Sequence, residues 1–137
     1  MILTDTGPLV ALFDPKDGEH AHAVKILEQV REPLITTIPV LTGAFHMLGP
    51  ASQGSGRLRD FVLARGVSVR FLNASGLERS FELMERYADQ PMDLADASLV
   101  VAAEELSTRK IFTLDRSDFT TYRVKRGHRH YPFDILS

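Results

Sequence analysis

The sequence has no cysteine among its 137 residues. Disulfide bonds, thiolate nucleophiles and zinc–thiolate sites are therefore excluded. A chain of this length can bury a core large enough to fold without such cross-links. The absence of cysteine also fits a reducing compartment.

Long hydrophobic runs are absent as well. The chain begins Met1-Ile2-Leu3-Thr4-Asp5, without the basic segment and apolar segment of a secretion signal. No apolar run approaches the roughly 20 residues that cross a bilayer. Hydrophobic residues make up 44% and charged residues 25%, which is typical of a globular protein and argues against disorder. We predict a cytoplasmic protein that folds as a single domain over residues 1–137.

A large excess of one charge is also missing, because the formal net charge is −2. Bulk electrostatics therefore do not predict a polyanion-binding protein. Residues 111–137 nevertheless carry five positive and three negative charges. We predict RNA contacts in this segment, with a merely solvated charged face as the alternative. The candidate contacts are Arg123, Lys125, Arg126 and Arg129.

Hydrophobic patterning predicts strands that alternate with helices. Short β-branched runs predict strands at residues 1–4, 34–37, 67–72 and 110–114. Helical spacing predicts helices at residues 20–32, 41–48, 58–64, 77–88 and 94–106, and residues 49–56 are expected to form a loop. This order predicts an α/β fold with a mainly parallel sheet that is covered on both faces.

Two of the predicted helices differ in how they should be buried. In the helix at 77–88, the apolar residues Leu77, Phe81, Met84 and Ala88 fall on one face, which we expect to be the buried face. The helix at 94–106 is apolar nearly all round. It should therefore be the central buried helix of the fold.

Aspartates follow the predicted strands at the places where such folds form sites. Asp5 and Asp115 each come directly after a strand, and Asp93 and Asp96 stand at the start of the buried helix. In parallel sheets, ligands bind outside the carboxyl ends of the strands. We therefore expect these carboxylates to lie at one edge of the sheet.

Capping of helix N-termini is the competing interpretation for most of these aspartates. Asp5 precedes Thr6-Gly7-Pro8, Asp93 stands three residues before Asp96, and Asp115 stands three before Asp118. Each spacing is typical of an N-cap. Asp96 differs because an acid that enters an apolar helix needs a partner, and a metal ion would be one.

Crowded carboxylates would raise one another's pKa values unless a cation neutralises them. Ligands that offer only oxygen suit Mg²⁺ or Mn²⁺. Such an ion can polarise a phosphodiester and lower the pKa of a bound water. The residues therefore favour metal-assisted hydrolysis of phosphodiester bonds.

Three segments of the sequence resemble PIN domains and, more narrowly, toxins of the VapC type. They are residues 3–9 (LTDTGPL), 91–99 (PMDLADASL) and 111–119 (IFTLDRSDF), and the resemblance covers essentially the whole chain. The resemblance implies a three-layer α/β/α sandwich and a metal-dependent ribonuclease. It also implies a homodimer that is inhibited by a VapB-type antitoxin.

The same resemblance assigns roles to individual residues. It places the metal-binding and catalytic aspartates at Asp5, Asp96 and Asp115, with Asp93 and Asp118 as auxiliary acids. The family has one further acid, a glutamate, at the position of Gly43. Glycine inside a helix costs about 1 kcal/mol relative to alanine, so this position is unusual on physical grounds as well. We expect the loss of a carboxylate, whether natural or introduced, to impair activity.

Three other functions compete with the nuclease. Asp5-Thr6-Gly7 matches the motif of retroviral-type aspartic proteases, but that fold is almost all β. A phosphoryl-transfer or receiver-like domain could use Asp5 as acceptor, although no convincing lysine motif follows. A non-catalytic module that binds RNA or antitoxin is the third alternative, and Gly43 favours it.

Overall fold

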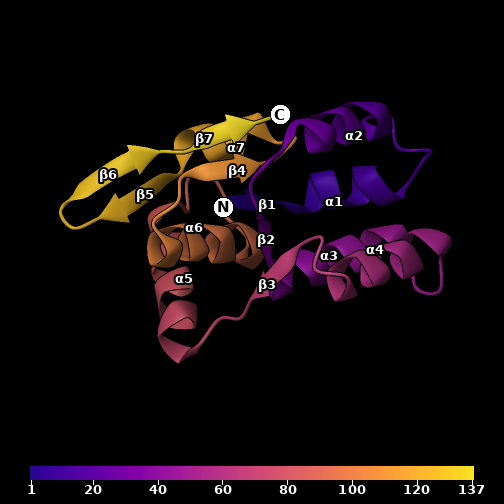
Figure 1. Ribbon diagram of the computed structural model, residues 1–137. Helices are drawn as coiled ribbons and strands as arrows, with labels where there is room; N and C mark the ends of the chain where they lie inside the picture. Colours follow the sequence, from indigo (N-terminus) through magenta and orange to yellow (C-terminus); the bar gives the residue numbers. More distant parts are fainter.

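The computed structural model describes residues 1–137 and centres on a five-stranded parallel sheet (Figure 1). Its strands are β1 (Ile2–Thr4), β2 (Leu34–Thr37), β3 (Ser68–Arg70), β4 (Lys110–Phe112) and β7 (Asp134–Leu136). Their order is β3-β2-β1-β4-β7, and every neighbouring pair is parallel. The predicted parallel sheet is confirmed, and β7 is a strand that the hydrophobic pattern did not predict.

Alternate residues of the central strands enter two separate hydrophobic clusters. Leu3 of β1 and Ile111 of β4 belong to the larger cluster, whereas Ile2 and Phe112 belong to the smaller one. This alternation follows from the two-residue period of a strand. Helices cover both faces of the sheet, so the three-layer α/β/α architecture is confirmed. The helices are α1 (Thr6–Phe13), α2 (His20–Gln29), α3 (Ile38–Leu48), α4 (Gln53–Leu63), α5 (Ala74–Arg86), α6 (Leu94–Leu106) and α7 (Arg116–Thr121).

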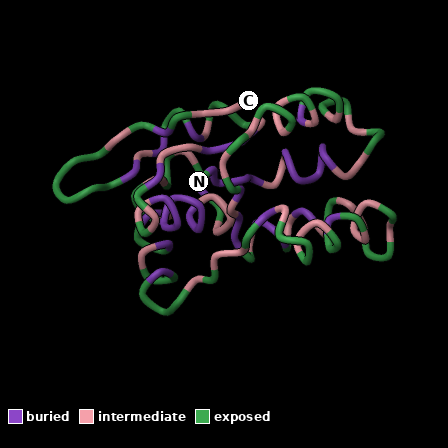
Figure 2. The backbone as a smooth tube through the Cα atoms, viewed as in Figure 1, coloured by how far each residue is buried: buried purple, intermediate pink, exposed green.

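Helix α6 forms the middle of the larger cluster. It begins and ends at the predicted residues, and seven consecutive residues from Ala97 to Ala103 are buried. Figure 2 shows most of this helix as buried backbone. The expectation of a central buried helix is confirmed.

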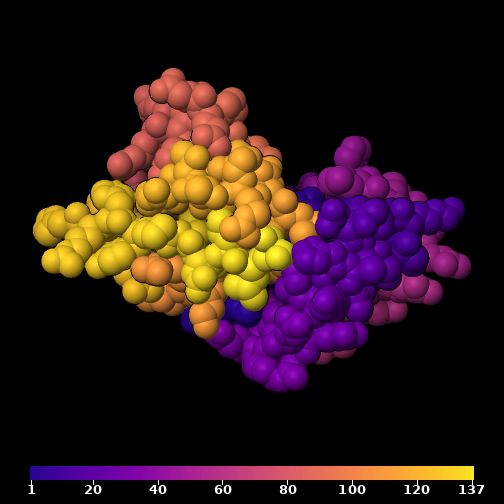
Figure 3. All heavy atoms as spheres, turned by 90° about the horizontal axis from the view of Figure 1, so that it is seen from above, coloured from indigo at the N-terminus to yellow at the C-terminus, as the bar shows by residue number.

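A separate two-stranded hairpin completes the fold. Strands β5 (Arg123–Arg126) and β6 (Arg129–Pro132) pair antiparallel and are not part of the main sheet. The hairpin projects from the body of the molecule (Figures 1 and 3). Its tip is exposed to solvent (Figure 2).

Helix α4 begins earlier than the sequence pattern predicted. Residues 49–56 were expected to form a loop, but the helix starts at Gln53, with the Ser52 side chain accepting a hydrogen bond from the Ser55 N–H. Gly54 permits close packing here, since a Cβ at this position would lie 2.6 Å from the Phe13 carbonyl oxygen. The glycine that indicated a loop is therefore a contact point between two helices.

Helix α5 buries a different face from the one we expected. The predicted core residues Leu77 and Phe81 are 37% and 54% exposed and Ala88 is exposed, whereas Met84 is half-buried against the core. The fully buried residues of the helix are Gly76, Ser80 and Leu83. The small residues let α5 approach its neighbours closely, and the Ser80 hydroxyl donates to the Gly76 carbonyl at 2.9 Å. The prediction was wrong for Leu77, Phe81 and Ala88, because helical spacing alone does not rank a face that contains small residues against one of large apolar residues.

No helix of this structure has the length and apolar character needed to cross a membrane.

The corrected orientation of α5 predicts opposite results for two apolar truncations. Leu83→Ala should lower the free energy of unfolding by about 2–5 kcal/mol, because it leaves a cavity in the core. Phe81→Ala should change it by less than about 0.5 kcal/mol, because the ring is largely exposed. Urea denaturation of both variants measures the difference. Equal losses of stability would contradict the orientation described here.

Candidate active site

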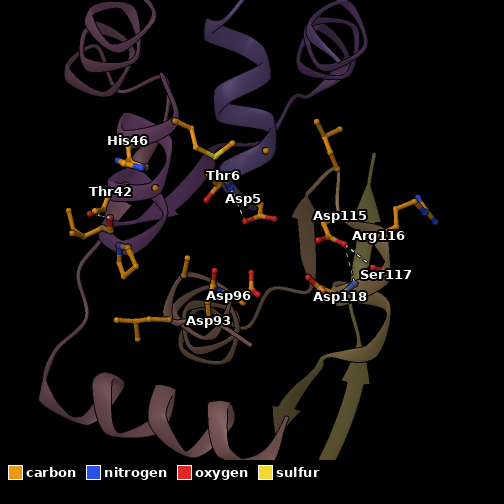
Figure 4. Close-up of a pocket in the computed structure, with 18 residues that line it drawn as sticks. Asp5, Thr6, Thr42, His46, Asp93, Asp96, Asp115, Arg116, Ser117 and Asp118 are labelled. Carbon is orange, nitrogen blue, oxygen red and sulfur yellow. Dashed lines mark hydrogen bonds between the residues drawn. The ribbon is translucent and has the colours of Figure 1, made fainter. Parts of the chain in front are cut away.

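Four segments enclose a groove at the carboxyl edge of the parallel sheet (Figure 4). They are the start of α1, one side of α3, the start of α6, and the segment that joins β4 to α7. The cavity measures about 1200 Å³ and is broadly open to solvent. The acidic residues that line it are Asp5, Asp93, Asp96, Asp115 and Asp118.

Asp5 forms the floor of the groove and is only 8% exposed. One carboxylate oxygen accepts the Thr6 N–H at 2.8 Å, which caps α1. The other accepts a hydrogen bond from the Thr113 hydroxyl at 2.8 Å. Asp5 is therefore both an N-cap and a groove residue, and the two interpretations of its sequence position are compatible.

Asp93 and Asp96 enter the groove from the first turn of α6. Asp93 caps the helix by accepting the Asp96 N–H at 2.8 Å, as its sequence position predicted. The Asp96 side chain has no capping role. It accepts a hydrogen bond from the Tyr122 hydroxyl at 3.2 Å. Of these two acids, only Asp93 uses its carboxylate to cap the helix.

Asp115 and Asp118 line the wall of the groove that the segment between β4 and the start of α7 forms (Figure 4). Asp115 caps α7 and accepts hydrogen bonds from the Ser117 hydroxyl at 3.0 Å and from the Asp118 N–H at 3.4 Å. Its own N–H donates to the Thr113 hydroxyl at 3.0 Å. The Thr113 hydroxyl therefore links the backbone of Asp115 to the carboxylate of Asp5.

The carboxylates of the groove have opposing pKa shifts. Burial, followed by the charges of Asp93 and Asp5, raises the pKa of Asp96 to about 7. Burial likewise raises the pKa of Asp5. Burial also acts to raise the pKa of Asp115, but the hydrogen bonds that its carboxylate accepts outweigh it and lower the pKa. Near neutral pH the groove thus combines an ionised acid with one that holds its proton part of the time.

The donor set of the groove fits a hard divalent cation. It consists of carboxylate and hydroxyl oxygens, which suit Mg²⁺ and Mn²⁺. No three acidic or histidine side chains are grouped closely enough to enclose a metal ion by themselves. A complete protein cage is not required for Mg²⁺, because this ion keeps several waters and binds through one or two carboxylates and the substrate phosphates.

Gly43 leaves a space on the α3 side of the groove. A Cβ at this position would meet only the Thr6 side chain, at 3.6 Å, which is an ordinary van der Waals contact. A longer side chain therefore has room to enter the groove from this position. Neighbouring positions on α3 carry Thr42 and His46, which also line the groove, so this wall has no carboxylate.

The cationic residues predicted to contact RNA lie elsewhere. Arg123, Lys125, Arg126 and Arg129 belong to the β5–β6 hairpin, and none of them lines the groove. Among the Lys and Arg residues, Arg116 lines the groove, and its guanidinium donates to the Ser137 hydroxyl. The structure therefore separates the candidate RNA contacts from the acids.

Two residues that support the acids were not identified from the sequence. Thr113 could have been found, because it directly follows β4 at the carboxyl edge of the sheet, where sites of parallel sheets form. Tyr122 carried no local signal. Its ring is buried and packs edge-on against Tyr87 and Phe119, and only the tertiary structure brings its hydroxyl to Asp96.

Comparison with known proteins adds independent information. The family model of the PIN domain matches residues 2–125. Ribonuclease VapC26 of Mycobacterium tuberculosis is 27% identical over 130 residues, which cover 93% of this chain and 96% of that protein.

Two solved structures share the fold. The crystal structure of Mycobacterium tuberculosis VapC20, described as a sarcin-ricin-loop-cleaving toxin, matches with a TM-score of 0.77 and 20% identity, over 86% of this chain and 94% of that one. A toxin–antitoxin complex from Klebsiella pneumoniae matches with a TM-score of 0.61 and 21% identity, over 88% of this chain and 92% of that one.

The raised pKa of Asp96 predicts a pH-dependent stability in metal-free buffer. An acid whose pKa is higher in the folded than in the unfolded state stabilises the fold at low pH, and that contribution is lost as the pH rises from about 4 to about 7. Asp96→Asn should therefore flatten the decline of Tm between pH 5 and pH 8. The exposed Asp89→Asn serves as the charge-matched control and should leave the decline unchanged. Parallel declines for the wild type and Asp96→Asn would contradict this assignment.

Proposed function

The chain belongs to the PIN-domain family, and from that premise we propose that it is a metal-dependent endoribonuclease toxin of the VapC type whose active site is incomplete at Gly43. The ribonuclease VapC26 is similar over almost the entire chain, which supports RNA as the substrate. The parallel α/β/α fold argues against the all-β aspartic protease considered from the Asp-Thr-Gly motif.

The observation that carries the proposal is the set of acids at one edge of the sheet. Asp5, Asp96 and Asp115 come from three separate elements and line one groove. Maintaining several carboxylates together, one of them buried, is unfavourable unless a cation or a proton compensates their charge. Burial and the charges of Asp93 and Asp5 raise the pKa of Asp96, which agrees with that cost.

In this proposal Asp5, Asp96 and Asp115 hold Mg²⁺ or Mn²⁺. The bound ion would polarise the phosphodiester and lower the pKa of a water. The chain itself orients the acids, because the Thr113 hydroxyl fixes Asp5 and the Tyr122 hydroxyl fixes Asp96. Asp93 and Asp118 act as auxiliary acids that add negative charge to the groove.

Partners follow from the same proposal. One of the solved structures with this fold is a toxin–antitoxin complex, which supports a VapB-type antitoxin as the inhibitor of this chain. The open groove is accessible both to an RNA strand and to an inhibitory segment. We further propose a homodimer as the assembled form.

The α3 side of the groove has no carboxylate, and this favours a second candidate function, a non-catalytic module that binds RNA or antitoxin. Without a carboxylate at position 43, the chain would retain the acidic groove and its partners while hydrolysing RNA poorly or not at all. The two candidates share a fold and differ in turnover. Cleavage measured on the unmodified chain, together with RNA binding, separates them.

Divalent metal should stabilise the protein through Asp96. Mg²⁺ or Mn²⁺ that binds only the folded state raises Tm with increasing concentration. Asp96→Asn should abolish this shift while leaving the helix caps in place, because Asp96 does not cap a helix through its side chain. NaCl at matched ionic strength controls for screening. A shift that survives in Asp96→Asn would remove Asp96 from the metal site.

Restoring an acid at position 43 should raise activity. Gly43→Glu should increase Mg²⁺-dependent cleavage of RNA by roughly 10²-fold or more, the scale of one positioned catalytic group. Gly43→Ala is the matched control, because it removes the helical glycine without adding a carboxylate. An equal gain in both variants would indicate that helix stability, and not the acid, limits activity. No gain in Gly43→Glu would contradict the proposed impairment.

A further inference from the structure

The tip of the β5–β6 hairpin, residues 125–130, presents a basic surface away from the protein core. Lys125 pairs with His130 across the two strands, and Arg126 pairs with Arg129 next to the turn. Because opposed residues share a face, Lys125 and His130 lie on the face opposite to Val124, which is buried. The pair therefore faces solvent, whereas Arg126 and Arg129 lie on the same face as Val124, beyond its buried part, so the exposed tip carries cations on both faces.

The cations of the hairpin divide into two that support the fold and two without a partner. The Arg123 guanidinium donates to the carbonyls of Thr120, Thr121 and Tyr122 at the end of α7. The Arg126 guanidinium donates to the Ser107 carbonyl at the end of α6. The side chains of Lys125 and Arg129 make no hydrogen bond or ion pair within the chain, and both residues are exposed.

The hairpin and its flanking residues combine several cations with no acidic residue: residues 119–133 contain four Lys and Arg residues and no Asp or Glu. Arg70, Arg79 and Lys110 all pair with glutamates. In contrast, none of the four Lys and Arg side chains of the hairpin has its charged group within 4.0 Å of a carboxylate oxygen. An uncompensated group of cations on a chain of net charge −2 is a local attraction for a polyanion.

The hairpin lies at the far end of α6 from the acids. Asp96 is in the first turn of this helix, and the Lys125 N–H bonds to Glu104 in the last turn. The eight residues between Asp96 and Glu104 correspond to about 12 Å along the axis. Because a stacked strand rises about 3.4 Å per nucleotide, an RNA must extend roughly four nucleotides or more from the groove to reach the hairpin, whose tip projects still further outward.

We propose that the hairpin tip binds the phosphate backbone of a folded RNA whose cleaved strand occupies the groove. This inference rests on the proposed function. Proteins that bind single strands commonly add aromatic side chains on which bases stack, and the one tyrosine of the hairpin, Tyr131, is half-buried, with Arg109 and Arg126 lying 5.6 and 5.9 Å from the centre of its ring. Lys125 and Arg129, on opposite faces of the tip, can contact phosphates on its two sides without reading bases, and phosphate contacts contribute most of the binding of helical RNA.

Removing the two unpartnered cations tests this proposal by binding alone. The probe is a stem-loop RNA, compared with a single-stranded oligonucleotide of the loop sequence, and fluorescence anisotropy is followed from low to high salt. Lys125→Ala/Arg129→Ala should weaken binding of the stem-loop roughly tenfold and reduce the slope of log K against log salt by about two, one for each phosphate contact. Binding of the single strand should change much less.

A charge-matched double variant provides the control. Lys16 and Lys25 are exposed, have no side-chain partner, and lie in or just before α2, on the other side of the molecule from the hairpin (Figure 1). Lys16→Ala/Lys25→Ala changes the net charge equally and should leave the salt slope close to that of the wild type. If both double variants behave alike, or if Lys125→Ala/Arg129→Ala binds the stem-loop as the wild type does, the proposal is overturned.

Two further results keep this inference distinct from the proposed function. If Lys125→Ala/Arg129→Ala loses binding to polyglutamate but binds the stem-loop as the wild type does, the hairpin tip is assigned to an acidic peptide and the RNA proposal is overturned. In the Gly43→Glu background, Lys125→Ala/Arg129→Ala should slow cleavage of the stem-loop but not of the short strand. The binding result stands even if no variant cleaves RNA.

Discussion

Three aspartates cap the helices that begin around the groove at the carboxyl edge of the sheet, and the candidate site depends on this arrangement. Asp5, Asp93 and Asp115 are the N-caps of α1, α6 and α7. Each accepts N–H groups that would otherwise lack a partner at the start of its helix. Because β1 and β4 are parallel, the helices after them start at the same edge of the sheet. The acids meet there as a consequence of chain direction and capping.

Bringing these carboxylates together is electrostatically unfavourable, and the surrounding groups shift their pKa values in different directions. Asp115 is exposed and accepts several hydrogen bonds, which favour its ionised form. Asp96 lies closer to the core and near two other acids, which favours its protonated form. The hydroxyls of Thr113 and Tyr122 hold Asp5 and Asp96 in place from beneath the groove. Hydrogen bonds thus fix the positions of these carboxylates, while the charge of the groove changes with pH near neutrality.

Local sequence signals predicted the parts of this fold that depend on local interactions. Helix α6 and strand β2 have the predicted bounds, and Asp93 caps α6 as its spacing indicated. The buried face of α5 was not predictable from spacing, because its contact with α6 depends on Gly76 and Ser80, which have little hydrophobicity. The contact between Tyr122 and Asp96 was hidden for a similar reason, since 26 residues separate them. A side-chain contact that only the tertiary structure creates, such as this one, leaves no short motif.

The double duty of the capping aspartates affects how related sequences should be interpreted. A descendant of such a protein that no longer cut RNA would still be under selection to keep Asp5, Asp93 and Asp115, because three helices begin at these side chains. Their presence would then report folding and not turnover. Positions free of structural duty, such as residue 43 and the side chain of Asp96, are free to drift once catalysis is abandoned. They would be the first record in the sequence that a nuclease had become a binding protein.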